Sequence, residues 1–275
     1  MFRVRHFDDL GAADAAILET FVVPRYLALY AGLFFEMLLT GDAARVAHLG
    51  CRTGYPDLDL FERIPSMSLT GVDNSLPALE LARNKAHARG ELDIEYLVTD
   101  GYPTELESEQ YSHALSLHPI LDELGRAALL EELARVLYSG GQALIAMPMR
   151  GSFQEIMDVF KEYALKQDDA DFSKALEAAF RTRPTLETLA EELEAAGLSD
   201  IDVKLQHKEL EFESGRALIE DPAMRLLILP EIRTWVQVDN LAPALDYLAQ
   251  AVDKYWSEDK LSLTLNVGCA SARKP

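Results

Sequence analysis

The chain has 275 residues, of which 49% are hydrophobic, and a formal net charge of −20 at pH 7. That length and apolar content suffice for one large domain with a sizeable core. The negative charge opposes binding to a phosphate backbone, whose affinity depends on Lys and Arg, so we expect no nucleic-acid partner.

The two cysteines, Cys51 and Cys269, lie outside any metal-ligand spacing. We therefore expect no metal site and no disulfide framework. The sequence shows no secretory leader and no apolar stretch of the ~18 residues that a membrane span needs. A cytoplasmic protein without a membrane partner is the expectation.

Residues 1–44 are expected to form two helices that Pro24 separates. The second of them, over 25–39, is rich in aromatic residues. These side chains either pack on the domain or belong to a lid over a substrate pocket. In the second interpretation Tyr26 and Tyr30 line the pocket.

A glycine-rich loop follows. The apolar run over 46–49 suits a buried parallel strand, and Gly50 and Gly54 bracket a tight loop. Pro56 and Asp57 favour the first turn of a helix. Strand, glycine-rich loop and helix is the arrangement with which a doubly wound sheet holds a nucleotide-like ligand.

A second apolar run, over 69–73, ends in an acid about twenty residues further on. That spacing fits a carboxylate, Asp73, that accepts hydrogen bonds from ribose hydroxyls. Asn74 and Ser75 offer N-cap oxygens for a helix that ends before Gly90. Loop and acid together indicate a nucleotide-like ligand better than the loop alone.

This pair resembles the class I S-adenosylmethionine-dependent methyltransferases. Their glycine motif reads roughly acid-x-Gly-x-Gly-x-Gly, and residues 48–54 read His-Leu-Gly-Cys-Arg-Thr-Gly. The outer glycines match, but the acid is replaced by His48 and the central glycine by Arg52. Both replacements fall where the family binds the methionine end of its cofactor. The resemblance implies S-adenosylmethionine as cofactor. The residues it places at that cofactor are Gly50, Cys51, Gly54, Asp73, Asn74, Asp100 and Gly101.

A third strand is expected over 94–98, closed by Asp100, Gly101 and Tyr102. In the family, the acid after this strand lies near the adenine amino group, with the next residues beside the ring. Asp100 takes that place. The alternative is a turn in which Asp100 caps its own backbone.

The fourth strand, over 111–117, ends at His118, where ligands approach an open α/β sheet. A histidine there is either the general base for a hydroxyl or carboxyl acceptor or a hydrogen-bonded loop residue. A helix over 126–137 and a turn at 140–141 lead into a fifth strand over 142–147. This succession is similar to the family's approach to its fifth strand.

Residues 151–275 continue the same domain. The expected elements are helices over 153–166, 171–180 and 183–196, a sixth strand over 201–212, a helical insertion over about 215–257 and a seventh strand over 261–272. The last strand fits the antiparallel seventh strand of a methyltransferase sheet.

The predicted fold class is therefore α/β: a Rossmann-like seven-stranded methyltransferase sheet, mostly parallel with an antiparallel last strand. Residues 1–44 form an N-terminal helical cap on a methyltransferase-like domain over 45–275.

Two functions stay open. One is a methyltransferase for a small-molecule acceptor, or less readily a protein, which mainly positions the acceptor and keeps water out. The other is a non-catalytic binding or regulatory partner that has lost the cofactor because of Arg52 and His48. An inward Arg52 belongs to the substrate pocket, occupies cofactor space, repels a sulfonium and attracts an anion such as a carboxylate. An outward Arg52 leaves the loop open. A nicotinamide-dependent oxidoreductase is disfavoured, since the loop lacks the GxGxxG spacing.

Overall fold

The structure is a computed structural model that describes residues 10–41, 43–64, 66–236, 241–256 and 260–275. By its internal contacts the chain divides into two compact units. Unit 1 comprises Met1–Met147, Leu186–Leu205 and Gly268–Pro275, and unit 2 comprises Pro148–Thr185 and Gln206–Val267. The division into a cap over 1–44 and a domain with an insertion stays a prediction.

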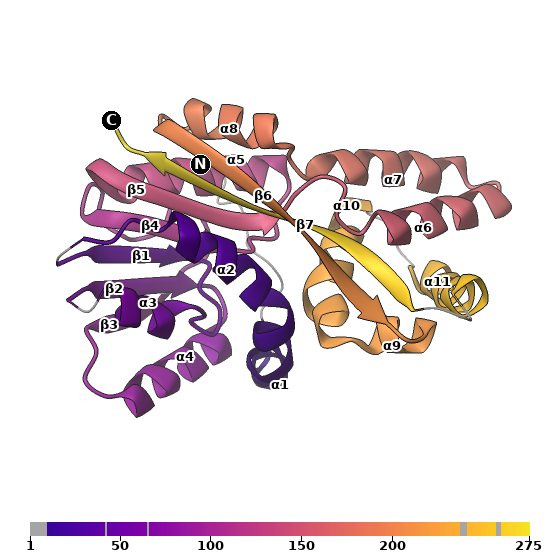
Figure 1. Ribbon diagram of the computed structural model, residues 1–275, viewed down its shortest axis with the longest axis horizontal. Helices are drawn as coiled ribbons and strands as arrows, with labels where there is room; N and C mark the ends of the chain where they lie inside the picture. Colours follow the sequence, from indigo (N-terminus) through magenta and orange to yellow (C-terminus); the bar gives the residue numbers. More distant parts are fainter. Residues whose placement is uncertain (1–9, 42, 65, 237–240, 257–259) are drawn as a thin grey trace. The chain divides into compact units, whose positions relative to one another are not determined.

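The strands form a seven-stranded sheet with the order β3-β2-β1-β4-β5-β7-β6 (Figure 1). Their bounds are β1 Arg45–Leu49, β2 Ser68–Asp73, β3 Ile94–Val98, β4 Tyr111–Leu117, β5 Leu137–Pro148, β6 Ser199–Phe212 and β7 Leu261–Arg273. β1 pairs in parallel with both β2 and β4, β2 with β3, and β4 with β5. The strand order therefore reverses between β1 and β4, and ligands of open α/β sheets bind at such a point.

The last strand, β7, runs antiparallel to β5. The N–H of Gly140 donates to the carbonyl of Lys274 at 2.7 Å, and the N–H of Lys274 donates to the carbonyl of Gly141 at 3.0 Å. Two residues of β5 thus lie opposite one residue just after β7, and the first of the two is a glycine, as in a β-bulge of an antiparallel pair. The predicted fold class, a Rossmann-like methyltransferase sheet, is confirmed.

The expected turn at 140–141 is wrong in one respect: Gly140 and Gly141 lie inside β5 rather than before it. The register along β4 and β5 shifts there, from Tyr111 opposite Leu137 to His113 opposite Gln142. Gly140 has a φ of +82°. The glycines thus form an irregularity within the strand, which lets the ladder continue on both sides of it.

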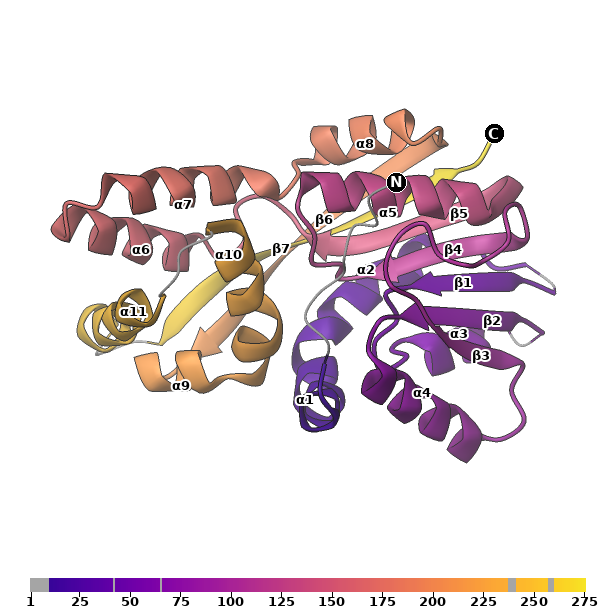
Figure 2. The same ribbon diagram turned by 180° about the vertical axis from the view of Figure 1, so that it is seen from behind.

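The helices of unit 1 are α1 Ala12–Ile17, η1 Leu18–Leu27, α2 Ala28–Met37, α3 Asp57–Arg63, α4 Leu76–Arg89, α5 Glu123–Val136 and α8 Leu186–Ala195. Figures 1 and 2 show α2 and α3 on one face of the sheet and α5 on the other. The Ser75 hydroxyl caps α4 by accepting from the N–H of Ala78, and the Asp122 carboxylate caps α5 by accepting from the N–H of Gly125. Asp122 as cap explains why α5 begins at Glu123, three residues before the predicted start.

The N-terminal helices differ from expectation, because Pro24 does not separate two of them. Pro24 lies inside η1, a π-helical segment that joins α1 to α2 without a break. In a π-helical turn each N–H bonds five residues back rather than four, which relieves the clash between a proline ring and the carbonyl four residues before it. The whole run, Ala12–Met37, has 26 residues and is apolar enough by length and composition to cross a membrane. Half of its most apolar 18-residue window is buried inside the protein, and the core helix of a protein can meet the same criterion.

Gly54 is expected to be intolerant of a side chain. Its φ is +71°, and an added Cβ would lie 2.5 Å from the Tyr96 hydroxyl. Gly54→Ala should lower the free energy of unfolding by about 2 kcal/mol, through left-handed strain and displacement of that hydroxyl. Chemical denaturation measures it. The control is Gly32→Ala in α2, where an added Cβ meets nothing within 4 Å, and which should be neutral or stabilising. Equal stability of the Gly54 variant and the wild type would contradict the packing described.

Unit 2 contains α6 Gln154–Lys166, α7 Ala170–Thr182, α9 Gly215–Glu220, η2 Met224–Ile228, α10 Leu229–Val236 and α11 Ala242–Tyr255. Inside it, the Arg183 guanidinium forms a buried ion pair of 2.6 Å with Glu231. The same guanidinium lies 5.0 Å from the ring centroids of Phe153 and Trp235. The aromatic Trp235 of the predicted insertion thus packs within unit 2.

Candidate functional site

The glycine loop, residues 50–54, is hydrogen-bonded to the end of β2. The N–H groups of Gly50 and Cys51 both donate to the Val72 carbonyl, at 2.9 and 3.1 Å. Gly50 has a φ of +71°, and Arg52 has a φ of +47°. Arg52 therefore has a left-handed backbone conformation, which normally favours glycine, the residue of the family's motif at this position. For a residue with a Cβ this conformation costs about 1 kcal/mol.

Asp73 closes β2 and faces this loop. Its Oδ2 accepts the N–H of Arg52 at 3.0 Å, and its Oδ1 accepts the N–H of Ser75 at 2.9 Å. The residue is only 7% exposed. Burial raises the pKa of the Asp73 carboxyl, and the hydrogen bonds from Ser75 and Arg52 oppose that rise. A carboxylate oxygen can accept more than one hydrogen bond, so both oxygens keep capacity for a hydroxyl donor. Asn74 follows, half-buried.

The Arg52 side chain points inward, the first of the two alternatives. Its Nη2 donates to the carbonyl of His118 at 2.8 Å, and its Nη1 lies 3.4 Å from the carbonyl of Leu117. The guanidinium therefore reaches from the loop after β1 to the carboxyl end of β4. Arg52 is half-buried. Burial lowers the pKa of its guanidinium, and the charge of Asp73 opposes that.

His48 lies beneath the loop and is 1% exposed. Its Nδ1 is 2.6 Å from Oδ1 of Asp57, and the Tyr96 hydroxyl donates to Oδ2 of Asp57 at 2.9 Å. Burial and the charge of Asp57 raise the pKa of Tyr96, which keeps the phenol a donor. His48 is thus part of a buried network with the start of α3. The sequence carried no local signal for this network, since Tyr96 is 39 residues from Asp57.

Cys51 reaches this part of the core as well. It is 2% exposed and packs in a cluster with Leu79, Ala82 and Tyr96. Burial, with the charges of Asp73 and Asp57, raises the pKa of its thiol. Since the side chain is in the core, the part of Cys51 that can meet a ligand is its backbone.

The loop after β3 carries the residues expected at the adenine. Asp100 is exposed and Gly101 is buried; the Gly101 carbonyl accepts from the Thr99 hydroxyl at 3.1 Å. Tyr102 is 2% exposed, and its hydroxyl would lie 3.7 Å from a Cβ on Gly50. The Tyr102 hydroxyl on this loop therefore lies near Gly50 of the glycine loop.

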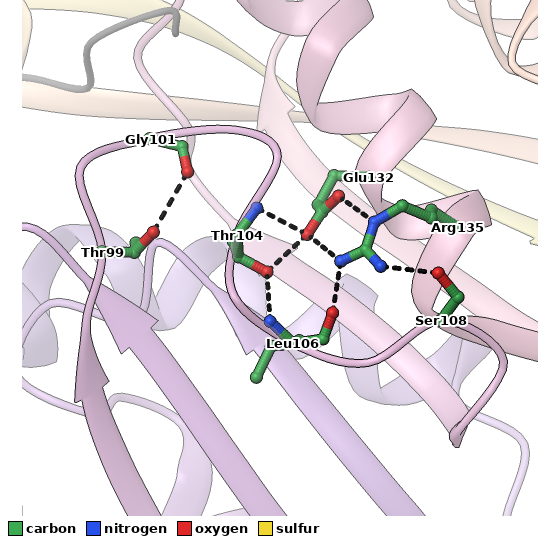
Figure 3. A network of polar contacts seen from close by, with 7 residues as sticks. All are labelled: Thr99, Gly101, Thr104, Leu106, Ser108, Glu132 and Arg135. Atoms are coloured by element: carbon green, nitrogen blue, oxygen red, sulfur yellow. Dashed lines mark hydrogen bonds and ion pairs between the residues drawn. The ribbon is translucent and has the colours of Figure 1, made fainter.

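A buried carboxylate on α5 holds the same loop (Figure 3). Glu132 Oε1 accepts the N–H of Thr104 at 2.9 Å and also bonds the Thr104 hydroxyl. Arg135 donates to Glu132 at 2.7 and 2.8 Å. Arg135 also donates to the Leu106 carbonyl and the Ser108 hydroxyl, both at 2.7 Å. No local sequence pattern indicates this network, because Glu132 looks like any other glutamate of an amphipathic helix.

Three predicted site residues come together at the end of β4. His118 Nε2 and the Tyr26 hydroxyl are 2.8 Å apart, and the hydroxyls of Tyr26 and Tyr30 are 2.9 Å apart. The His118 ring meets both tyrosine rings edge to face, with centroids 5.1 and 4.9 Å away. All three residues are buried. The N-terminal helical run thus contributes side chains to the same strand end that Arg52 reaches.

No group of three or more His, Cys, Asp or Glu residues that could hold a metal ion occurs in the part of the chain that the structure describes. The polar groups of the site belong instead to a loop, a strand-end carboxylate and a guanidinium.

Comparison with known proteins agrees with this arrangement. Residues 46–141 match a family model described as a methyltransferase domain. The chain is 27% identical over 187 residues to a carboxy-S-adenosyl-L-methionine synthase of Histophilus somni (strain 129Pt), covering 64% of this chain and 77% of that protein. It is 28% identical over 133 residues to a demethylmenaquinone methyltransferase of Thermus thermophilus, covering 47% and 60%.

A solved structure shares the fold. The phosphoethanolamine N-methyltransferase 2 of Haemonchus contortus, in complex with S-adenosyl-L-methionine, superposes with a TM-score of 0.54 at 19% identity. The alignment covers 90% of this chain but only 52% of that one, so the chain spans about half the length of that enzyme. Residues 46–141 therefore match a methyltransferase domain, and the strand order and this superposition show that the chain has the fold of the class I S-adenosylmethionine-dependent methyltransferases; the superposed structure holds S-adenosylmethionine.

Proposed function

We propose that this protein transfers a methyl group from S-adenosylmethionine to a small-molecule acceptor. The observation that carries the proposal is the Asp73 carboxylate. It closes β2, faces the glycine loop, and is oriented by the N–H groups of Arg52 and Ser75. Its remaining acceptor capacity suits the two hydroxyls of a ribose.

The residues around Asp73 fit the rest of the cofactor in two respects. Gly50 has no Cβ, so the ligand can approach the backbone closely. The guanidinium of Arg52 suits the carboxylate at the methionine end, because planar guanidinium and carboxylate groups form paired hydrogen bonds. Arg52 does not suit the sulfonium, which carries the same charge sign.

When bound, S-adenosylmethionine supplies a methyl group on a positively charged sulfur. The chain's own residues would position the acceptor and keep water out. His118, in contact with Tyr26 at the end of β4, would receive the proton of a hydroxyl or carboxyl acceptor on its imidazole. Asp100 and Gly101 would lie at the adenine, as the family resemblance implies.

The names of the relatives support a small acceptor. One is named as the synthase of a small molecule, carboxy-S-adenosyl-L-methionine, and the other is named as a methyltransferase of demethylmenaquinone. We further propose that the protein works in the cytoplasm, without a nucleic-acid or membrane partner. The net charge of −20 supports the first of these exclusions.

A second candidate is a non-catalytic binding protein. The observation that favours it is the position of Arg52, whose guanidinium bonds the carbonyl of His118 at 2.8 Å and so crosses from β1 to β4. In this candidate the side chain fills the space of the cofactor's methionine end, and the altered loop serves a partner protein.

Calorimetric titration with S-adenosylmethionine and S-adenosylhomocysteine separates the candidates. We expect the wild type to bind both with micromolar dissociation constants. Arg52→Gly, measured beside it, returns the loop to the family's pattern. Binding by this variant together with no binding by the wild type would show that Arg52 blocks the site, and would replace the first candidate by the second.

A further inference from the structure

We propose that the Arg52 guanidinium is a binding group for a ligand's carboxylate. The proposal deepens the proposed function and rests on it for the place of the ligand. The ligand would carry its carboxylate next to the ends of β1 and β4, either as the amino-acid end of the cofactor or as part of the second substrate.

The hydrogen bonding of Arg52 leaves donors available. Its guanidinium uses one N–H on Nη2 for the carbonyl of His118 and directs Nη1 at that of Leu117. Among the residues that the structure describes, Nε–H and the second N–H on each Nη have no protein acceptor. The contacts with the two carbonyl groups fix the plane of the guanidinium, but they do not neutralise its positive charge.

The charge of Arg52 also lacks a direct partner. Asp73 is near enough to affect its pKa, yet the two side chains form no ion pair within the described residues, and the Asp73 oxygens face backbone N–H groups. Three other arginines that are buried or half-buried each meet a glutamate at 2.6 or 2.7 Å: Arg126, Arg135 and Arg183.

An unpaired, partly desolvated cation is unfavourable, and an anion that enters with its own hydrogen-bond acceptors removes that penalty. A carboxylate is the anion whose two oxygens match a planar fork. The negative charge of the bound carboxylate would also offset the repulsion between the guanidinium and a sulfonium bound beside it. A carboxylate is therefore the ligand group that we expect to bind at Arg52.

The test is calorimetry on the full chain with four ligands: S-adenosylhomocysteine, 5′-methylthioadenosine, which lacks the amino-acid end, and malonate and benzoate as carboxylate probes. The variants are Arg52→Gln, which removes the charge, and Arg52→Lys, which keeps the charge without the fork. Both keep a non-glycine residue at 52. The control Arg216→Gln removes an arginine that is 82% exposed. Thermal melting of each variant confirms that it folds.

Two results support the proposal and identify the source of the carboxylate. If it is the cofactor's, Arg52→Gln weakens S-adenosylhomocysteine binding at least about tenfold and leaves 5′-methylthioadenosine within about twofold, with Arg52→Lys in between. If it belongs to the second substrate, both nucleosides keep their affinity. Malonate or benzoate then binds the nucleoside-loaded wild type and the Arg216→Gln control, but at least about tenfold more weakly to Arg52→Gln.

The proposal is overturned if Arg52→Gln changes none of these affinities, or if it tightens S-adenosylhomocysteine binding. Failure of the proposed function is a separate result: the wild type then binds neither nucleoside. In that case malonate and benzoate titrated into the protein alone decide. Binding that Arg52→Gln abolishes supports a carboxylate group at Arg52, and no binding to the wild type overturns it.

Discussion

Asp73→Asn is expected to weaken the binding of S-adenosylhomocysteine by about 100-fold, because a hydrogen bond to a charged acceptor contributes about 1.5–3 kcal/mol. Asparagine keeps the shape of the side chain but offers one acceptor oxygen. Its NH₂ group would face the N–H of either Arg52 or Ser75, which now donate to the two carboxylate oxygens. Ribose hydroxyls then lose their acceptor as well. Calorimetric titration measures the effect.

The matched control is Asp93→Asn, an exposed residue before β3, which should bind like the wild type. An Asp73→Asn variant that binds within about threefold of the wild type would remove the ribose contact from the proposal.

The pH dependence has a definite sign. Burial raises the pKa of Asp73 in the folded state. Between its ordinary value and that raised value the folded state binds more protons, so this group makes stability fall as pH rises. The affinity for a ligand that donates hydrogen bonds to Asp73 should have the opposite pH dependence. It should fall as the pH drops through the raised pKa, because a protonated carboxyl group accepts fewer hydrogen bonds. In Asp73→Asn the contribution of this group to both dependences should vanish.

Glu132→Gln is expected to lower the free energy of unfolding by about 3 kcal/mol, which is in the range for breaking a buried ion pair. Glu132 is 2% exposed and accepts from both Thr104 and Arg135. A glutamine would turn an NH₂ group toward one of these donors. For a chain of this size the melting temperature should fall by roughly 5–10 °C. Thermal unfolding measures it.

Glu131→Gln is the control for this variant, because Glu131 is an exposed neighbour on the same helix and should stay within about 0.5 kcal/mol of the wild type. Since Glu132 also holds the loop that carries Gly101 and Tyr102, 5′-methylthioadenosine should bind more weakly to Glu132→Gln. Equal melting temperatures for the two variants would show that the network adds no stability.

Much of unit 1 could be predicted because its signals are local. The apolar run over 46–49 and the acid at Asp73 lie on β1 and β2 within a residue of the predicted bounds. The strand over 111–117 was predicted with its observed bounds. Strand periodicity, glycine positions and cap residues act over a few residues, so a single sequence reveals them.

The errors arose where a local rule met a longer-range constraint. Pro24 suggested a helix break, but the buried aromatic residues of the N-terminal run hold one continuous helical path through η1. Gly140 and Gly141 suggested a turn before β5, yet their hydrogen bonds with Lys274 keep them in the strand. Packing and ladder pairing outweighed the propensity of single residues.

The sequence by itself determined the sheet, the glycine loop and the carboxylate that follows it, along with the two departures from the family's motif. Only the tertiary structure decided what those departures do: His48 turns to Asp57 and Tyr96, and Arg52 reaches the carbonyl of His118, 66 residues away. The physical reason is that a side chain's direction depends on the charges and acceptors that the fold brings near it. Those partners lie on other strands and helices, where no local pattern records them.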